Sequence, residues 1–257
     1  GISVRGVYRQ PADLLRLDSD AYLGPPENVR AGRIGLLYRW KSQRPHREMA
    51  YLPRNGQGLR IRYHLVSSAI YGDFDYRRTT VEYFTHWIVA PGPAVLFLHG
   101  KGSSLTGRTP SQDRVALLGD PPVHLNPGSA LGFLLPFVEV PVFHHLRGLE
   151  RPVLGAAAIS GTIELRVPLL AKPVIKVIGL EVGQITAALF ADLGQVWEAG
   201  NFASGSPRTT AGMEFKGNIL TGSLPLLTLA WGQAGGSDAW RKGDPVAYLE
   251  LGLVSPF

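Results

Sequence analysis

The sequence predicts an all-β protein, an antiparallel β-barrel that crosses a membrane through its strands. Three observations predict this fold: apolar and polar residues alternate in segments along the chain, glycine and proline are frequent, and the last strand candidate ends on Phe257. Alternation with period two is typical of strands whose two faces have different surroundings, and frequent Gly and Pro indicate many turns. A last strand ending on an aromatic residue is typical of a membrane barrel, in which that strand closes against the first and removes both sheet edges.

Composition bounds the fold and excludes several classes of site. The chain has 257 residues, of which 45% are hydrophobic, and no apolar run reaches the ~18 residues of a transmembrane helix. The apolar signal of a barrel strand is halved by alternation, so this composition fits a membrane barrel as well as a soluble all-β protein. The chain contains no cysteine, which excludes disulfides, thiol nucleophiles and Cys-based metal sites. We expect one domain over residues 1–257.

The net charge of +6 comes mainly from arginine. Because the basic residues are spread along the chain, they do not predict a nucleic-acid partner. No signal peptide is visible, and Gly1 leads directly into strand-like sequence. We interpret this start as a processed or truncated N-terminus.

Strand candidates follow one another with turn signals between them. A Pro-Gly-Pro turn at 91–93, for example, separates two alternating segments. The clearest candidates are residues 33–41, 59–69, 78–89, 94–101, 161–169, 185–197, 209–219, 225–231 and 246–257. Residues 1–9, 113–119 and 133–147 bring the expected total to about 12 strands. We expect loops at residues 10–30, 41–56, 102–112, 120–130 and 232–245.

The parity of each strand separates an apolar face from a polar face. In a membrane barrel the apolar face contacts lipid and the polar face lines the lumen, whereas in a soluble sandwich the polar face is a solvated surface. The expected inward residues are Arg60, Arg62, His64, Arg78, Glu82, His86, Glu164, Arg166, Asp192, Glu214, Lys216 and Glu250. The aromatics near strand ends would form interfacial girdles: Tyr38, Trp40, Tyr71, Tyr76, Trp87, Trp197, Trp231, Tyr248 and Phe257.

Arg147 and Asp192 are the candidate buried ion pair. A guanidinium held in a lumen needs a partner, and a carboxylate that accepts it bidentately is the strongest one available. Asp192 lies opposite the apolar stripe of its strand, so parity places it inward. In the alternative interpretation, Arg147 is a solvated loop residue and Asp192 a charge at a strand end.

Three short motifs resemble the barrel of the BamA-like outer-membrane assembly and secretion superfamily, also called the bacterial surface antigen family. Leu146-Arg147-Gly148 is similar to the family's Arg-Gly tip on a long loop folded into the barrel, although Leu149 replaces the usual aromatic. Phe190-Ala191-Asp192-Leu193-Gly194 is similar to its Phe-x-Asp-x-Gly strand motif. The ending, with Glu250, Gly252 and Phe257, is similar to its C-terminal recognition signal, with Ser255 in place of the first aromatic. The resemblance covers residues 140–257.

This resemblance implies a bacterial outer-membrane protein that inserts proteins into that membrane or translocates them across it. It further implies that Arg147 and Gly148 meet Phe190, Asp192 and Gly194 inside the lumen, and that the last strand closes the barrel. The family's well-known barrels have sixteen strands, so this chain is either part of such a barrel or a smaller relative. The implied partners are outer-membrane lipid and proteins of the envelope.

Two other functions stay open at this stage. One is a pore or a scaffold barrel that anchors a partner complex, and the other is a soluble β-sandwich binding module. Enzymatic signals are weak. Residues 97–103 mimic a hydrolase oxyanion loop, but the Gly-x-Ser-x-Gly elbow is missing from the sequence. His144 and His145 would face opposite ways on a strand, and the acids Glu82, Glu164 and Glu250 fit a charged lumen. We therefore expect no enzyme activity, no cofactor and no metal.

Overall fold

The computed structural model describes residues 2–9, 29–44, 55–89, 93–119, 123–126, 143–149, 153–170, 175–177, 180–198, 200–201, 205–221, 224–236 and 246–253. The protein is all-β over these residues, and its one short 3-10 helix is η1 (Ser111–Asp113). No helix of this described part is long and apolar enough to cross a membrane.

The described residues form ten long strands and five short ones. The long strands are β1 (Ile2–Arg9), β2 (Val29–Arg44), β3 (Asn55–Val66), β4 (Asp75–Ile88), β5 (Val95–Arg108), β10 (Ala157–Leu170), β12 (Leu180–Trp197), β13 (Arg208–Thr221), β14 (Leu224–Gly236) and β15 (Val246–Leu253). The short strands are β6 (Val115–Leu118), β7 (Val123–Asn126), β8 (Phe143–His145), β9 (Val153–Gly155) and β11 (Ile175–Val177).

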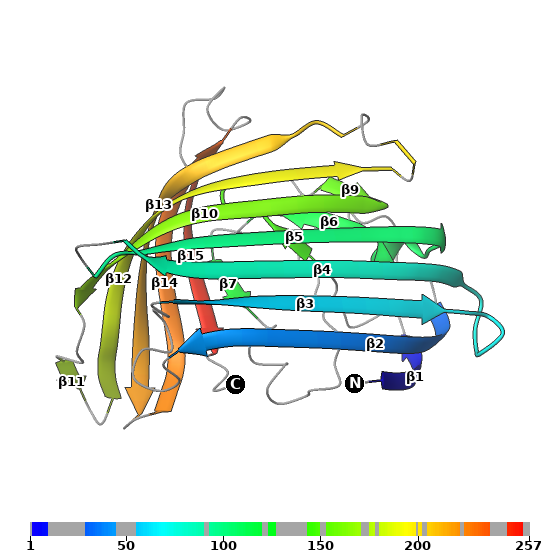
Figure 1. Cartoon of the computed structure of the whole chain (residues 1–257), viewed down its shortest axis with the longest axis horizontal. Helices are drawn as coiled ribbons and strands as arrows, with labels where there is room; N and C mark the ends of the chain where they lie inside the picture. The colour runs from blue at the N-terminus through cyan, green and yellow to red at the C-terminus, as the bar shows by residue number, and fades with distance from the viewer. Residues whose placement is uncertain are drawn as a thin grey trace.

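The ten long strands, together with β7 and β11, form one strongly curved sheet of 12 described strands (Figure 1). Its order is β1-β2-β3-β4-β5-β10-β12-β13-β14-β15-β7, and β11 is paired with β12. Long neighbours are antiparallel throughout. The insertion between β5 and β10 carries η1 and strands β6 to β9, of which β7 pairs with β15 of the large sheet. Antiparallel pairing along the chain therefore follows the sequence prediction.

The described strands do not close into a barrel, which corrects the closed form expected from the sequence. β1 pairs only with β2, and β15 pairs with β14 on one edge and in parallel with β7 on the other. The pairing with β7 runs from Leu249 to Gly252 and occupies the edge that the first strand was expected to take. The expected closing contact between the last and first strands is therefore missing from the described residues.

A small sheet, in the order β8-β6-β9, covers one face of the large sheet. In Figure 1, β6 lies behind β5 and β10, and it packs against β5, β10 and β12, whereas β9 packs against β12. Leu117 of β6 and the neighbouring Leu146 are fully buried in this contact. They form a hydrophobic cluster with residues of the large sheet, among them Val66, Tyr76, Leu105, Ala158 and Val196. We call the covered face the inner face and the opposite face the outer face.

The two faces have the inverse of the usual polarity. Large apolar side chains are exposed on the outer face, whereas charged side chains are buried on the inner face. On β10, for example, Ile163 is 57% exposed while the adjacent Glu164 is 2% exposed. Exposed residues of the outer face include Tyr38, Trp40, Val81, Tyr83, Trp87, Ile163, Leu165, Val167, Leu189, Leu193, Met213, Phe215 and Trp231. Buried inner charges include Arg33, Arg78, Glu164, Asp192 and Glu214.

Several expected boundaries differ from the structure. Residues 102–108 were expected in a loop but continue β5, and residues 123–126 of another expected loop form β7. Gly102 pairs on both sides, with Val81 and Ile159, so it lies inside the sheet. Of the candidate 133–147, residues 143–145 form β8 and residues 133–142 lie outside the described part. Tyr76 was wrongly placed in an aromatic girdle, because it is buried on the inner face.

Candidate functional site

The candidate site begins at the tight turn that follows β8. The Leu146 N–H donates to the carbonyl of Leu118 on β6 at 2.8 Å, and the Leu149 N–H donates to the carbonyl of Leu146 at 3.2 Å. Gly148 has φ +76°, in the left-handed region that glycine adopts without strain. A Cβ on Gly148 would lie 2.5 Å from the Cβ of Ala234 on β14. A glycine is therefore needed both for the turn and for its close approach to β14.

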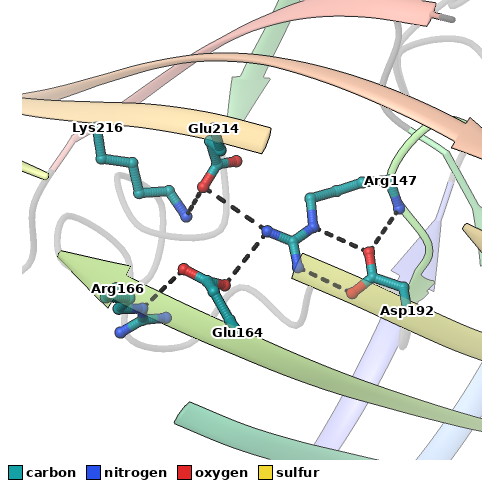
Figure 2. Close-up of polar contacts among 6 residues, drawn as sticks. All are labelled: Arg147, Glu164, Arg166, Asp192, Glu214 and Lys216. Atoms are coloured by element: carbon teal, nitrogen blue, oxygen red, sulfur yellow. Dashed lines mark hydrogen bonds and ion pairs between the residues drawn. The ribbon is translucent and has the colours of Figure 1, made fainter. Parts of the chain in front are cut away.

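This turn directs Arg147 onto the inner face of β12, where it meets Asp192 (Figure 2). Arg147 Nε donates to Asp192 Oδ2 at 2.9 Å, and Nη2 donates to Oδ1 at 2.8 Å. The backbone N–H of Arg147 also donates to Oδ2, at 3.2 Å. The carboxylate thus accepts the side chain bidentately and fixes the backbone of the turn as well.

Three further inner-face side chains complete the surroundings of the guanidinium. Arg147 Cζ lies 3.5 Å from the ring centroid of Phe190, close enough for a cation–π contact. Arg147 Nη1 lies 3.2 Å from Glu164 Oε2 on β10 and 3.7 Å from Glu214 Oε1 on β13. The sheet register explains this grouping, since Glu164 lies directly opposite Phe190.

Two more cations neutralise the additional carboxylates. Arg166 Nε is 2.7 Å from Glu164 Oε1, and Lys216 Nζ is 2.6 Å from Glu214 Oε1. Three cations and three carboxylates therefore form a connected network with no net formal charge. We call these six residues the Arg147 cluster: Arg147, Glu164, Arg166, Asp192, Glu214 and Lys216 (Figure 2).

The centre of the Arg147 cluster is sealed from solvent. The side chains of Arg147, Glu164, Asp192 and Glu214 are all at most 8% exposed. Burial by itself would lower the pKa of Arg147, but its hydrogen bonds to Asp192 and the charges of the three carboxylates raise that pKa above its ordinary range. The guanidinium therefore stays charged. Removing it would leave the buried carboxylates around it without their shared cation.

Of the five residues that the resemblance placed around the loop tip, Arg147, Asp192 and Phe190 are in direct contact. Gly148 forms the turn itself and approaches Ala234, whereas Gly194 lies against Leu117 of β6. A Cβ on Gly194 would lie 2.7 Å from Leu117 Cδ1, so this glycine gives the small sheet its seat on β12. Parity had also assigned Glu164, Arg166, Glu214 and Lys216 to the inner face, but without joining them to Arg147. These residues meet Arg147 because of the register between β10, β12 and β13, and alternation within one strand does not specify that register.

The residues of the expected closure signal are only partly described. Glu250 and Gly252 lie in β15, opposite Ala230 and Thr228 of β14. Phe257 lies outside the described residues. Gly252 also pairs with Asn126 of β7, so the structure places this segment at a parallel contact.

A second polar contact holds the start of the insertion. Asp113 in η1 accepts a hydrogen bond from the Tyr76 hydroxyl at 2.7 Å, and its Oδ1 lies 3.7 Å from Arg78 Nη2. Arg33 Nη2 donates to the Tyr76 hydroxyl oxygen at 3.5 Å. The inserted segment is thus attached to the inner face by charged groups at η1 as well as at Arg147.

Replacing Tyr76 with phenylalanine should lower the free energy of unfolding by about 1.5–3 kcal/mol, because it removes a buried hydrogen bond to a charged carboxylate. Urea unfolding followed by tryptophan fluorescence would measure this change. Tyr83→Phe is the matched control, since the exposed Tyr83 hydroxyl donates to Gln57 Oε1 at 2.9 Å, and it should change stability by less than about 0.5 kcal/mol. Equal effects of the two substitutions would contradict the attachment at Asp113.

The remaining polar side chains singled out in the sequence have structural surroundings. His144 is buried and its Nδ1 lies 2.9 Å from Ser160 Oγ, whereas His145 is exposed, so the two face opposite ways. Burial lowers the pKa of His144 to about 3, which keeps it neutral. Residues 97–103 lie within β5, and His99 Nε2 is 3.2 Å from Glu82 Oε1. Within the described residues, no group of three His, Asp or Glu side chains is arranged to hold a metal ion.

The arrangement of the Arg147 cluster suits attachment of the turn to the sheet, because every carboxylate in it contacts a cation. Comparison with known proteins does not identify a family. No protein-family model matches the chain, and no curated protein matches its sequence.

Proposed function

We propose that this chain is a transmembrane β-barrel of a bacterial outer membrane that takes part in inserting proteins into that membrane or moving them across it. One observation carries the membrane location. The outer face exposes rows of large apolar side chains, while the inner face buries charges. Water would favour the reverse arrangement, whereas lipid outside and a polar interior favour this one.

A barrel in lipid also requires every strand edge to be paired, since unpaired backbone groups there cost several kcal/mol each. In the membrane, the open edge of β1 and the edge of β15 must therefore find partner strands. The parallel pairing of β15 with β7 involves four residues of β15. This edge is the part of the sheet best suited to exchange partners.

The protein-transport role is supported by the resemblance to BamA-like barrels. Two of the three motifs imply that an Arg-Gly tip meets a Phe-x-Asp-x-Gly strand, and Arg147 contacts Phe190 and Asp192 in this way. The described strands β6, β8 and β9 of the inserted segment pack against β5, β10 or β12 of the large sheet. A pore or scaffold would use the same barrel without acting on client proteins.

The membrane location predicts a large cost for a charge on the outer face. Leu189 is 60% exposed at the middle of β12. Leu189→Arg should destabilise the protein folded in lipid vesicles by about 2–4 kcal/mol, because arginine is costly near the bilayer midplane. Urea unfolding in vesicles would measure this cost.

The control for this test is Ser104→Arg, an exposed position on the same face where β5 is already polar. It should cost about 0–1 kcal/mol, the range found near the membrane interface. If the protein folds in buffer without detergent and Leu189→Arg changes its stability by less than about 0.5 kcal/mol, as for an ordinary surface substitution, the membrane location is wrong.

The transport role needs a separate measurement. The protein would be folded into vesicles, and heat-modifiable gel migration would establish that it is folded. A urea-unfolded outer-membrane barrel would then be diluted into these vesicles, and we expect its folding to be several-fold faster than in empty vesicles. Folded protein that does not accelerate the client would favour the pore or scaffold function.

A further inference from the structure

A second group of charges on the inner face differs from the Arg147 cluster in both balance and accessibility. Its centre is Glu82 on β4, which lies 2.9 Å from Arg60 Nη1 and 3.2 Å from His99 Nε2. Lys101 on β5 is the direct cross-strand neighbour of Glu82. We call the cations Arg39, Arg60, Arg62 and Lys101, which surround Glu82, the basic wall.

The register explains why these cations crowd together. Arg39 lies opposite Arg60, Arg60 opposite Glu82, and Glu82 opposite Lys101, so one row across four strands contains three cations and one carboxylate. Arg62 lies two residues along β3, on the same face as Arg60. Directly opposed like charges destabilise a sheet. Counted over the described residues of this row, the basic wall therefore carries an excess of positive charge, whereas the charges of the Arg147 cluster cancel.

Solvent reaches the centre of this group, whereas the centre of the Arg147 cluster is sealed. The side chains of Arg60, Glu82 and His99 are 35%, 24% and 27% exposed, compared with 2% for Asp192. A dissolved anion can therefore approach the basic wall. Several guanidinium and ammonium groups arranged in this way are suited to phosphate or carboxylate oxygens, which arginine can bind bidentately.

We propose that the basic wall is a binding site for a multivalent anion that carries phosphate or carboxylate groups. Such an anion neutralises the cations that Glu82 alone leaves in excess. Binding occurs on the inner face between β2 and β5, away from the six residues that hold the turn at Arg147. The site depends on the charges of this face, so it can be tested whether or not the protein resides in a membrane.

The probes are sodium tripolyphosphate and a hexaglutamate peptide, titrated into the folded protein in low salt by isothermal calorimetry. Both should bind, and binding should weaken as salt is raised, because the attraction is screened. Tighter binding of tripolyphosphate would identify a phosphate ligand, and tighter binding of the peptide an acidic polypeptide.

The double variant Arg60→Gln with Arg62→Gln should raise the dissociation constant about tenfold or more. Its matched control is Arg77→Gln with Arg108→Gln, which removes two charges at exposed positions and should have less than about a twofold effect. Glu82→Gln should tighten binding, because it removes the competing carboxylate. This gain distinguishes a binding site from a purely structural role. If Glu82 only held Arg60 and His99 in place, losing its contacts with them would weaken binding and would not tighten it.

The proposal is overturned if neither anion binds the folded wild-type protein. It is equally overturned if the two double variants weaken binding to the same extent, or if Glu82→Gln weakens it. Failure of client folding in vesicles would leave these results unaffected, so the two proposals can fail separately.

Discussion

Arg147→Ala should lower the free energy of unfolding by about 3–5 kcal/mol, the range found when one member of a buried ion pair is removed. The substitution leaves the carboxylates of Asp192 and Glu164 buried without the guanidinium that contacts both. It also removes the cation from the face of Phe190. Urea unfolding, with heat-modifiable migration as a second readout, would measure the loss.

Arg114→Ala is the matched control for this substitution. Arg114 also forms an ion pair, with Glu198, but the side chains of that pair are 35% and 61% exposed. Exposed pairs contribute about 0–1 kcal/mol, so the control should be nearly neutral. Arg147→Lys distinguishes charge from geometry, since an ammonium cannot reproduce the bidentate contact with Asp192. Stability unchanged in Arg147→Ala would show that the turn is held without this residue.

Alternation was sufficient to predict most of the fold. Where one face is apolar and the other polar, as around Leu189 and Asp192, parity gives both the strand and the side to which each residue points. It fails where strands are rich in glycine and serine. The second half of β5 was mistaken for a loop, because Gly102, Ser103 and Ser104 carry no apolar pattern. In the structure, this half of β5 pairs with β4 on one side and with β10 on the other.

The sequence pattern did not predict which residues far apart in the chain come into contact. The Arg147–Asp192 contact was proposed from a motif and from the chemistry of a buried cation, but its extension to Glu214 depends on the relative positions of β12 and β13. The pairing of β7 with β15 has no sequence signal, since Val123 to Asn126 is too short to show a period. Burial of Tyr76 likewise depends on Asp113, a residue 37 positions away.

Leu117→Ala should lower the free energy of unfolding by about 2–5 kcal/mol, as for other large-to-small substitutions at fully buried leucines. Leu117 is completely buried between the small sheet and the inner face. Gly194→Ala should itself cost about 1–3 kcal/mol, because the new methyl group would overlap Leu117 Cδ1 and Cδ2, which lie 2.7 and 2.9 Å from its position. Urea unfolding would again measure both losses.

The double variant decides whether these two losses share one cause. When Leu117 is alanine, the methyl group of Ala at position 194 has room, so the combined loss should be smaller than the sum of the single losses by about 0.5–3 kcal/mol. Gly100→Ala is the control, because a Cβ there meets nothing within 4 Å, and its effect should add to that of Leu117→Ala within about 0.5 kcal/mol. Strict additivity of Leu117→Ala and Gly194→Ala would mean that the small sheet does not rest on β12 at this glycine. A coupling found at Gly194 and not at Gly100 would mean that the Phe-x-Asp-x-Gly motif has two structural roles. Asp192 holds the turn through its charge, and Gly194 leaves the space into which Leu117 of the small sheet packs.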